Sequence, residues 1–199
     1  MSAPTDGGSP AGGGGPRTVP CIALLQGINV GRARRVAMSA LRDLLEALGL
    51  RDVRTLLNSG NAVFRGSPGV EATALAIRAA IEARFGLRVP VIVITAEQLS
   101  AIVAENGLPQ ATGDPSRLLV AFLSTRAALD RARGMLAQSW APEALAVGSQ
   151  AAYVWCVNGV AASPLMRALA QLDTGVATTR NWTTVLKLQA AAGDTRQTP

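Results

Sequence analysis

The chain has 199 residues, of which 49% are hydrophobic, with 19 Lys+Arg against 13 Asp+Glu and no histidine. Without histidine there is no Ser-His-Asp or Cys-His nucleophile site, no imidazole general base and no histidine metal ligand. Schiff-base or ammonium chemistry would have to use Lys187, the single lysine. The sequence indicates neither a metal nor a cofactor, and it identifies no catalytic residue.

The net charge of +6 raises nucleic-acid binding as a hypothesis. All but one of the 19 basic residues are Arg, however, and Ala is abundant, a combination that GC-rich coding also produces. Apart from Arg32, Arg34 and Arg35, the basic residues form no dense stripe. We therefore give the charge less weight than its size suggests.

The sequence predicts a cytoplasmic protein without a membrane partner. No apolar run approaches the roughly 20 residues that cross a bilayer, and no apolar segment follows a basic cluster at the N-terminus, so no signal peptide is evident. Cys21 and Cys156 both lie in apolar, strand-like runs. Two buried thiols in a reducing compartment explain this placement better than a disulfide or a metal pair.

The first half predicts strands and helices in the order β-α-β-β-α-β. Continuous apolar runs predict buried strands, apolar residues every three or four positions predict helices, and Gly49 and Gly86 end those helices. A hairpin turn is expected at Ser59-Gly60. The strands are 21–25, 53–57, 62–64 and 89–94, and the helical stripes run from Met38 to Leu48 and from Val70 to Phe85. This is the ferredoxin-like pattern.

The second half repeats the theme after a connecting helix and loop. Thr95 and Gln98 form a capping box for that helix, which runs to Asn106, and Ser163-Pro164 opens a later helix that runs to Leu172. The remaining elements are strands over 118–123, 144–147 and 153–157 and helices over 127–138 and 182–192. The last of these is a helix where the repeat calls for a closing strand, so we expect a modified or incomplete second half.

The fold class is therefore α+β, with two related ferredoxin-like halves and a C-terminal helix. The expected organisation is a disordered tail over 1–19, a first half over 20–94, a connecting helix and loop over 95–116, a second half over 117–192 and a flexible tail over 193–199.

Three polar segments interrupt the apolar elements. Gly27 to Gly31 leads into three arginines and could form an anion cradle, Asn58 to Asn61 could present amides to a polar ligand, and Thr178 to Lys187 begins a helix. Each segment also has a purely structural explanation. In order, these are a solvated loop, a turn whose asparagines bond to its own backbone, and a helix cap. From these segments we predict ligand binding by Asn29, Gly31, Asn58, Ser59, Asn61, Arg180, Asn181 and Lys187.

These same segments resemble a bacterial family called "domain of unknown function 1697". The resemblance rests on Ala23 to Gly31 with Met38 and Leu41 to Leu45, on Val53 to Thr55 with Asn58 to Phe64, and on Thr178 to Leu188. It spans roughly residues 21–191, and it implies a cytoplasmic bacterial α+β protein with no established activity.

The leading hypothesis is a protein that binds a small anionic ligand, nucleotide-like or phosphate-like, in a cleft between its two halves. The first alternative is an RNA-binding module, although core packing explains the aromatic pair Tyr153 and Trp155 better than base stacking does. The second is an enzyme of unknown reaction that works without histidine or metal. The sequence does not determine the oligomeric state.

Overall fold

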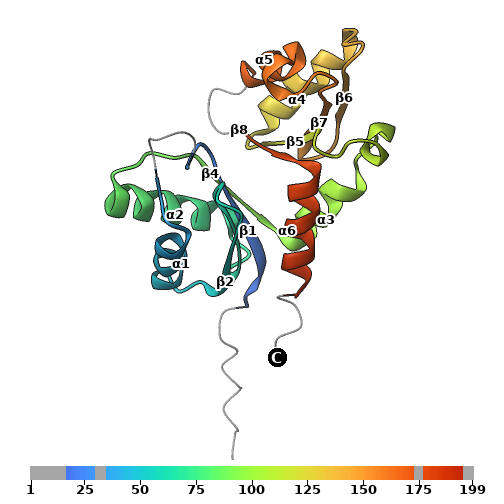
Figure 1. Cartoon of the computed structure of the whole chain (residues 1–199). Coiled ribbons are helices and arrows are strands. Elements are labelled where there is room, and N and C mark those ends of the chain that lie inside the picture. Colours follow the sequence, from blue (N-terminus) through green and yellow to red (C-terminus); the bar gives the residue numbers. More distant parts are fainter. Residues whose placement is uncertain (1–16, 30–34, 173–176, 195–199) are drawn as a thin grey trace, which may run out of the picture.

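The computed structural model describes residues 17–29, 35–172 and 177–194 (Figure 1). Its first half is a four-stranded antiparallel sheet in the order β2-β3-β1-β4 with two helices on one face. The elements are β1 (Val19–Leu25), α1 (Met38–Ala47), β2 (Arg51–Leu56), β3 (Asn61–Gly66), α2 (Val70–Phe85) and β4 (Val91–Thr95). The predicted β-α-β-β-α-β order is confirmed.

The second half repeats this arrangement in a second antiparallel sheet, ordered β6-β7-β5-β8. Helix α3 (Ala96–Ala104) and the 3-10 turn η1 (Pro109–Thr112) connect the halves. The half itself contains β5 (Leu118–Leu123), α4 (Arg126–Gly134), η2 (Met135–Ala137), β6 (Ala144–Val147), β7 (Ala151–Trp155), η3 (Val160–Ala162), α5 (Pro164–Ala170), β8 (Ala177–Asn181) and α6 (Trp182–Asp194). The expected C-terminal helix is present.

The expectation that the second half lacks a closing strand is wrong. Strand β8 closes the repeat by pairing with β5, and α6 follows it directly. The polar sequence of Thr178 to Asn181 lacks the continuous apolar pattern of a buried central strand. Strand β8 lies at the edge of its sheet, with a neighbouring strand on one side only, so its residues need not all be apolar.

The sheets and helices enclose three apolar cores. One lies between the first sheet and α1 and α2, and another lies between the second sheet and α4 and α5. The third and central core lies between the two sheets and includes α3 and α6, which Figure 1 shows between the halves. Strand β1 is apolar throughout because Ile22 and Leu24 face the central core while Cys21, Ala23 and Leu25 face α1 and α2.

Local signals placed most element ends correctly. The Thr95–Gln98 capping box and the Ser163 cap are both present, and Gly49 and Gly86 follow their helices at positive φ. Several boundaries differ from the prediction. The strands predicted over 53–57, 89–94 and 153–157 are β2, β4 and β7, each displaced by one or two residues, and the helices predicted to reach Asn106 and Leu172 end at Ala104 and Ala170. The β2–β3 connection has four residues, 57–60, α4 ends at Gly134 in a 3-10 turn, and α6 continues to Asp194. Most of the two predicted tails, residues 1–16 and 195–199, lies outside the described residues.

Both cysteines are buried free thiols in different cores, as the apolar runs predict. Burial raises the pKa of Cys21 to about 11, and it also raises the pKa of Cys156. Neither thiol therefore has the thiolate character of a nucleophile at neutral pH.

Tyr153 is also fully buried, and its hydroxyl donates to the Ile102 carbonyl at 2.5 Å. This confirms the core-packing prediction for Tyr153 and leaves its ring unavailable for base stacking. No helix within the described ranges is long and apolar enough to cross a membrane.

Candidate functional site

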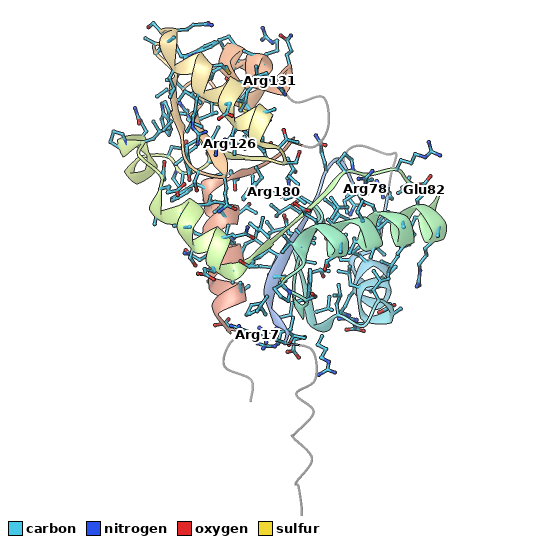
Figure 2. The ribbon with its side chains drawn as sticks, turned by 180° about the vertical axis from the view of Figure 1, so that it is seen from behind. Arg17, Arg78, Glu82, Arg126, Arg131 and Arg180 are labelled. Carbon is cyan, nitrogen blue, oxygen red and sulfur yellow. The ribbon has the colours of Figure 1, made fainter. Side chains whose placement is uncertain are left out.

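Arg180 on β8 lies where the two halves meet (Figure 2). In the β5–β8 register, Thr178 and Arg180 lie opposite Phe122 and Val120, which belong to the central core. Side chains alternate between the two faces of a strand, so Arg180 points away from its own half's helices and toward the first half.

The guanidinium of Arg180 donates to six oxygens drawn from both halves. Its Nε donates to Asn61 Oδ1 at 2.5 Å, and one terminal nitrogen donates to Thr178 Oγ1 at 2.7 Å and to the Thr179 carbonyl at 2.8 Å. The other terminal nitrogen donates to the carbonyls of Leu25 at 2.8 Å, Ser59 at 3.3 Å and Gly60 at 3.4 Å. Nε and one terminal nitrogen therefore hold the end of β1 and the β2–β3 turn against β8, while the other terminal nitrogen bonds within β8 and orients the guanidinium.

The β2–β3 turn is built to present these acceptors. Leu57 and Gly60 both have positive φ, and Gly60 accepts a hydrogen bond from the Leu25 amide at 2.8 Å. The buried Asn61 amide donates to the Leu56 carbonyl and to Ser59 Oγ, which directs its oxygen at Arg180. The polar Asn58–Asn61 run thus satisfies its own backbone and also binds Arg180.

Asn29 connects the loop after β1 to the same turn. Its amide nitrogen donates to the carbonyls of Val36 and Asn58 at 2.9 Å each, and its oxygen accepts from the Val36 amide at 2.8 Å. Residue 29 has a φ of 56°, a conformation that Asn adopts more easily than most residues. Asn29 therefore fixes the end of the loop beside the junction.

Among the described residues, no opposite charge lies beside Arg180. Every acceptor is a neutral amide, hydroxyl or carbonyl oxygen, and in the part of the chain that the structure describes, no Asp or Glu forms an ion pair with it. Burial lowers the pKa of Arg180 to about 10, which leaves the guanidinium protonated at neutral pH. Within the described ranges the junction thus holds a positive charge without a partner, an arrangement that anions compensate.

The structure brings five of the eight predicted ligand-binding residues together and separates two others, Asn181 and Lys187, from them. The group at the junction, called here the Arg180 cluster, is Asn29, Asn58, Ser59, Asn61 and Arg180. Asn181 instead caps α6 by accepting from the Thr184 amide at 2.9 Å, and Lys187 is exposed further along that helix. Gly31 lies outside the described residues.

Several hydrogen-bond acceptors of Arg180 were not predicted from the sequence. The carbonyls of Leu25, Gly60 and Thr179 accept from Arg180, and a backbone carbonyl has no residue type that could mark it. Thr178 Oγ1 was identifiable, because it lies two residues from Arg180 on the same strand face.

A cleft of about 350 Å³ does lie between the halves. Its walls come from α2, β4 and α3 on one side and from the end of β5 and the start of α4 on the other. None of the predicted ligand-binding residues lines it. Among the residues described, no group of three or more Cys, Asp or Glu side chains is placed to hold a metal ion.

Comparison with known proteins places the chain in a family. The model of the family described as "Protein of unknown function (DUF1697)" matches residues 19–153, more than half of the chain. The chain belongs to this family.

A solved structure of similar fold is that of a conserved bacterial protein from Streptococcus pneumoniae. It is 20% identical, has a TM-score of 0.69, and its alignment covers 88% of this chain and 99% of the other. At this identity the likeness shows the fold alone. No curated protein matches the chain.

Proposed function

We propose that this DUF1697 protein binds a small anionic ligand, phosphate-like or nucleotide-like, at the Arg180 cluster between its two halves. One observation carries the proposal: a mostly buried guanidinium lies at the junction with only neutral acceptors around it. A buried charge without a partner is costly. An anion beside the cluster supplies the missing opposite charge without displacing the existing hydrogen bonds.

Exposed polar groups next to Arg180 give such an anion its contacts. Asn58 is exposed, and no hydrogen bond joins its side chain to another described residue. Arg35 is exposed directly before Val36, which Asn29 ties to the same turn. Asn58 therefore offers an amide donor beside the cluster, and we propose that the Arg35 side chain adds a guanidinium, a group well suited to bidentate phosphate recognition.

A thermal-shift panel of inorganic phosphate, pyrophosphate, ATP and glucose 6-phosphate tests the proposal. At one hundred times its Kd, a ligand of the folded state adds about 2.7 kcal/mol of stability, which for a chain of this size raises Tm by roughly 5–10 °C. We expect at least one probe to do so. The double variant Arg35→Ala/Asn58→Ala should keep the unliganded Tm and lose most of this increase.

The matched control is Arg167→Ala, which removes an exposed arginine from α5 in the other half. It should respond to the probes as the wild type does. If no probe raises Tm, or if the double variant responds like Arg167→Ala, the cluster is a structural joint without a ligand and the proposal is wrong.

A further inference from the structure

The outer edge of β4 has backbone groups that bond to none of the described residues. The amide of Gln26 donates to the Pro90 carbonyl, which makes this a hydrogen-bonded pair of the antiparallel β1–β4 ladder. Such pairs recur at every second residue, so Ile92 and Ile94 bond to β1 while Val91 and Val93 direct their N–H and C=O groups away from it.

On that outward side, no described residue bonds to these groups. Strand β4 is at the edge of its sheet, and the hydrogen bonds of the described chain include none to the N–H or C=O of Val91 or Val93 from that side. The two residues are nevertheless only 4% and 5% exposed. Buried backbone polar groups are nearly always paired, so within the described part of the chain this edge lacks a partner.

The unpaired edge opens into the cleft between the halves. Residues 91–94 line that cleft, which has the volume of a small binding site, about 350 Å³. Apolar residues line it on both sides of the strand, with Val70 and Ala74 of α2 on one side and Phe122 and Leu129 of the second half on the other. The polar lining residues are Glu71, Gln98, Ser124, Thr125, Arg126 and Gln150.

The start of α4 brings positively charged groups to the cleft. Thr125, the N-cap of α4, and Arg126, its first residue, both line it. The first turn of α4 contains no acidic residue, so the positive end of its dipole is not neutralised there. The Arg126 side chain is 79% exposed, and among the residues described it pairs only with Asp130 of its own helix. Figure 2 shows it above the junction between the halves.

From these observations we propose that the cleft binds an extended segment of a partner protein, which adds to β4 as a fifth strand. Four apolar residues of the partner segment would span about 13 Å and match the length of Val91 to Ile94. The partner residues that bond to Val91 and Val93 would carry small side chains toward α2. The residue between them would face Phe122. An acidic residue at the segment's end would complement Arg126 and the α4 N-terminus. Main-chain hydrogen bonds supply affinity in this mode of recognition, and the side-chain walls supply specificity.

Fluorescence anisotropy with labelled peptides tests this. The probes are Val-X-Val-Ile-Asp peptides in which X is Ala, Val, Ile or Phe, each with a twin whose alternate backbone amides are N-methylated. We expect saturable binding that depends on X, and N-methylation should weaken it by about tenfold or more because each lost bond is worth about 1 kcal/mol.

Substitutions in the protein test the same inference independently of the peptide. Val93→Pro removes an outward N–H without removing a bond to β1, which is a tolerated place for proline, and it should abolish binding. Arg126→Glu should weaken binding several-fold, whereas Arg131→Glu, an exposed arginine of the same helix outside the cleft, should not.

Circular dichroism must show that each variant is folded. Should Val93→Pro unfold the chain, the N-methylated twins and the Arg126→Glu and Arg131→Glu pair still decide the question. No saturable binding of any probe, or equal binding of the methylated twins, means that water alone occupies the edge and overturns the inference. Peptide binding that survives in Arg35→Ala/Asn58→Ala would show that this site is separate from the anion site.

Discussion

Arg180→Ala is expected to lower the free energy of unfolding by about 3 kcal/mol or more, because it leaves several buried acceptors without a donor. The affected groups include Asn61 Oδ1, Thr178 Oγ1 and the Leu25 carbonyl, which belong to different strands of both halves. Urea-induced unfolding measured by circular dichroism gives this value.

Two further variants show whether the loss comes from the guanidinium's geometry. Arg180→Lys keeps the charge but cannot donate in a planar fork, so it should be intermediate between wild type and Arg180→Ala. Arg167→Ala, which removes an exposed arginine, should change stability by no more than about 0.5 kcal/mol. If Arg180→Ala is as stable as Arg167→Ala, the hydrogen bonds of Arg180 do not hold the halves together.

Gly60→Ala should be the second strongly destabilising change, at about 2–4 kcal/mol. A Cβ at residue 60 would lie 2.8 Å from Leu25 Cβ and from Ile28 Cγ1, and the residue has a φ of +75°. The added methyl group would push the β2–β3 turn away from β1, and with it the carbonyls that accept from Arg180.

Gly49→Ala is the matched control for this substitution. Gly49 has nearly the same φ, +80°, but no atom lies within 4 Å of the position its Cβ would take. It should cost only the backbone strain of about 1 kcal/mol. The difference between the two unfolding free energies therefore isolates the contact with β1, and equal losses would contradict the close packing of the turn.

The sequence predicted the first half well because its periodicities are strong. Strand β1 is continuously apolar because both of its faces are buried, and α1 has apolar residues every three or four positions because one of its faces is buried. The structure confirms both elements. Strand β8 was missed for the opposite reason. Its threonines and Arg180 lie at a sheet edge and at the junction, where polar side chains find partners that no local pattern records.

The candidate site was predictable as a set of segments but not as a geometry. Asn29, Asn58 to Asn61 and Arg180 are conspicuous polar residues at strand ends, and they meet. Lys187 was included because it is a polar residue of the same Thr178–Lys187 segment. It lies six residues after Asn181, however, which is about 240° around a helix. The side chains of Asn181 and Lys187 therefore point to different sides of α6.

The most direct test of anion binding at the Arg180 cluster is an NMR titration of the ¹⁵N-labelled protein with pyrophosphate, at constant ionic strength against chloride. The Arg180 Nε–H, which is hydrogen-bonded to Asn61, is a reporter inside the cluster. We predict saturable shifts of this signal and of the Asn58 and Ser59 amides, with none for Ser149 in the β6–β7 turn. Shifts that do not saturate, or that occur equally at Ser149 and at the cluster, would contradict the proposed function.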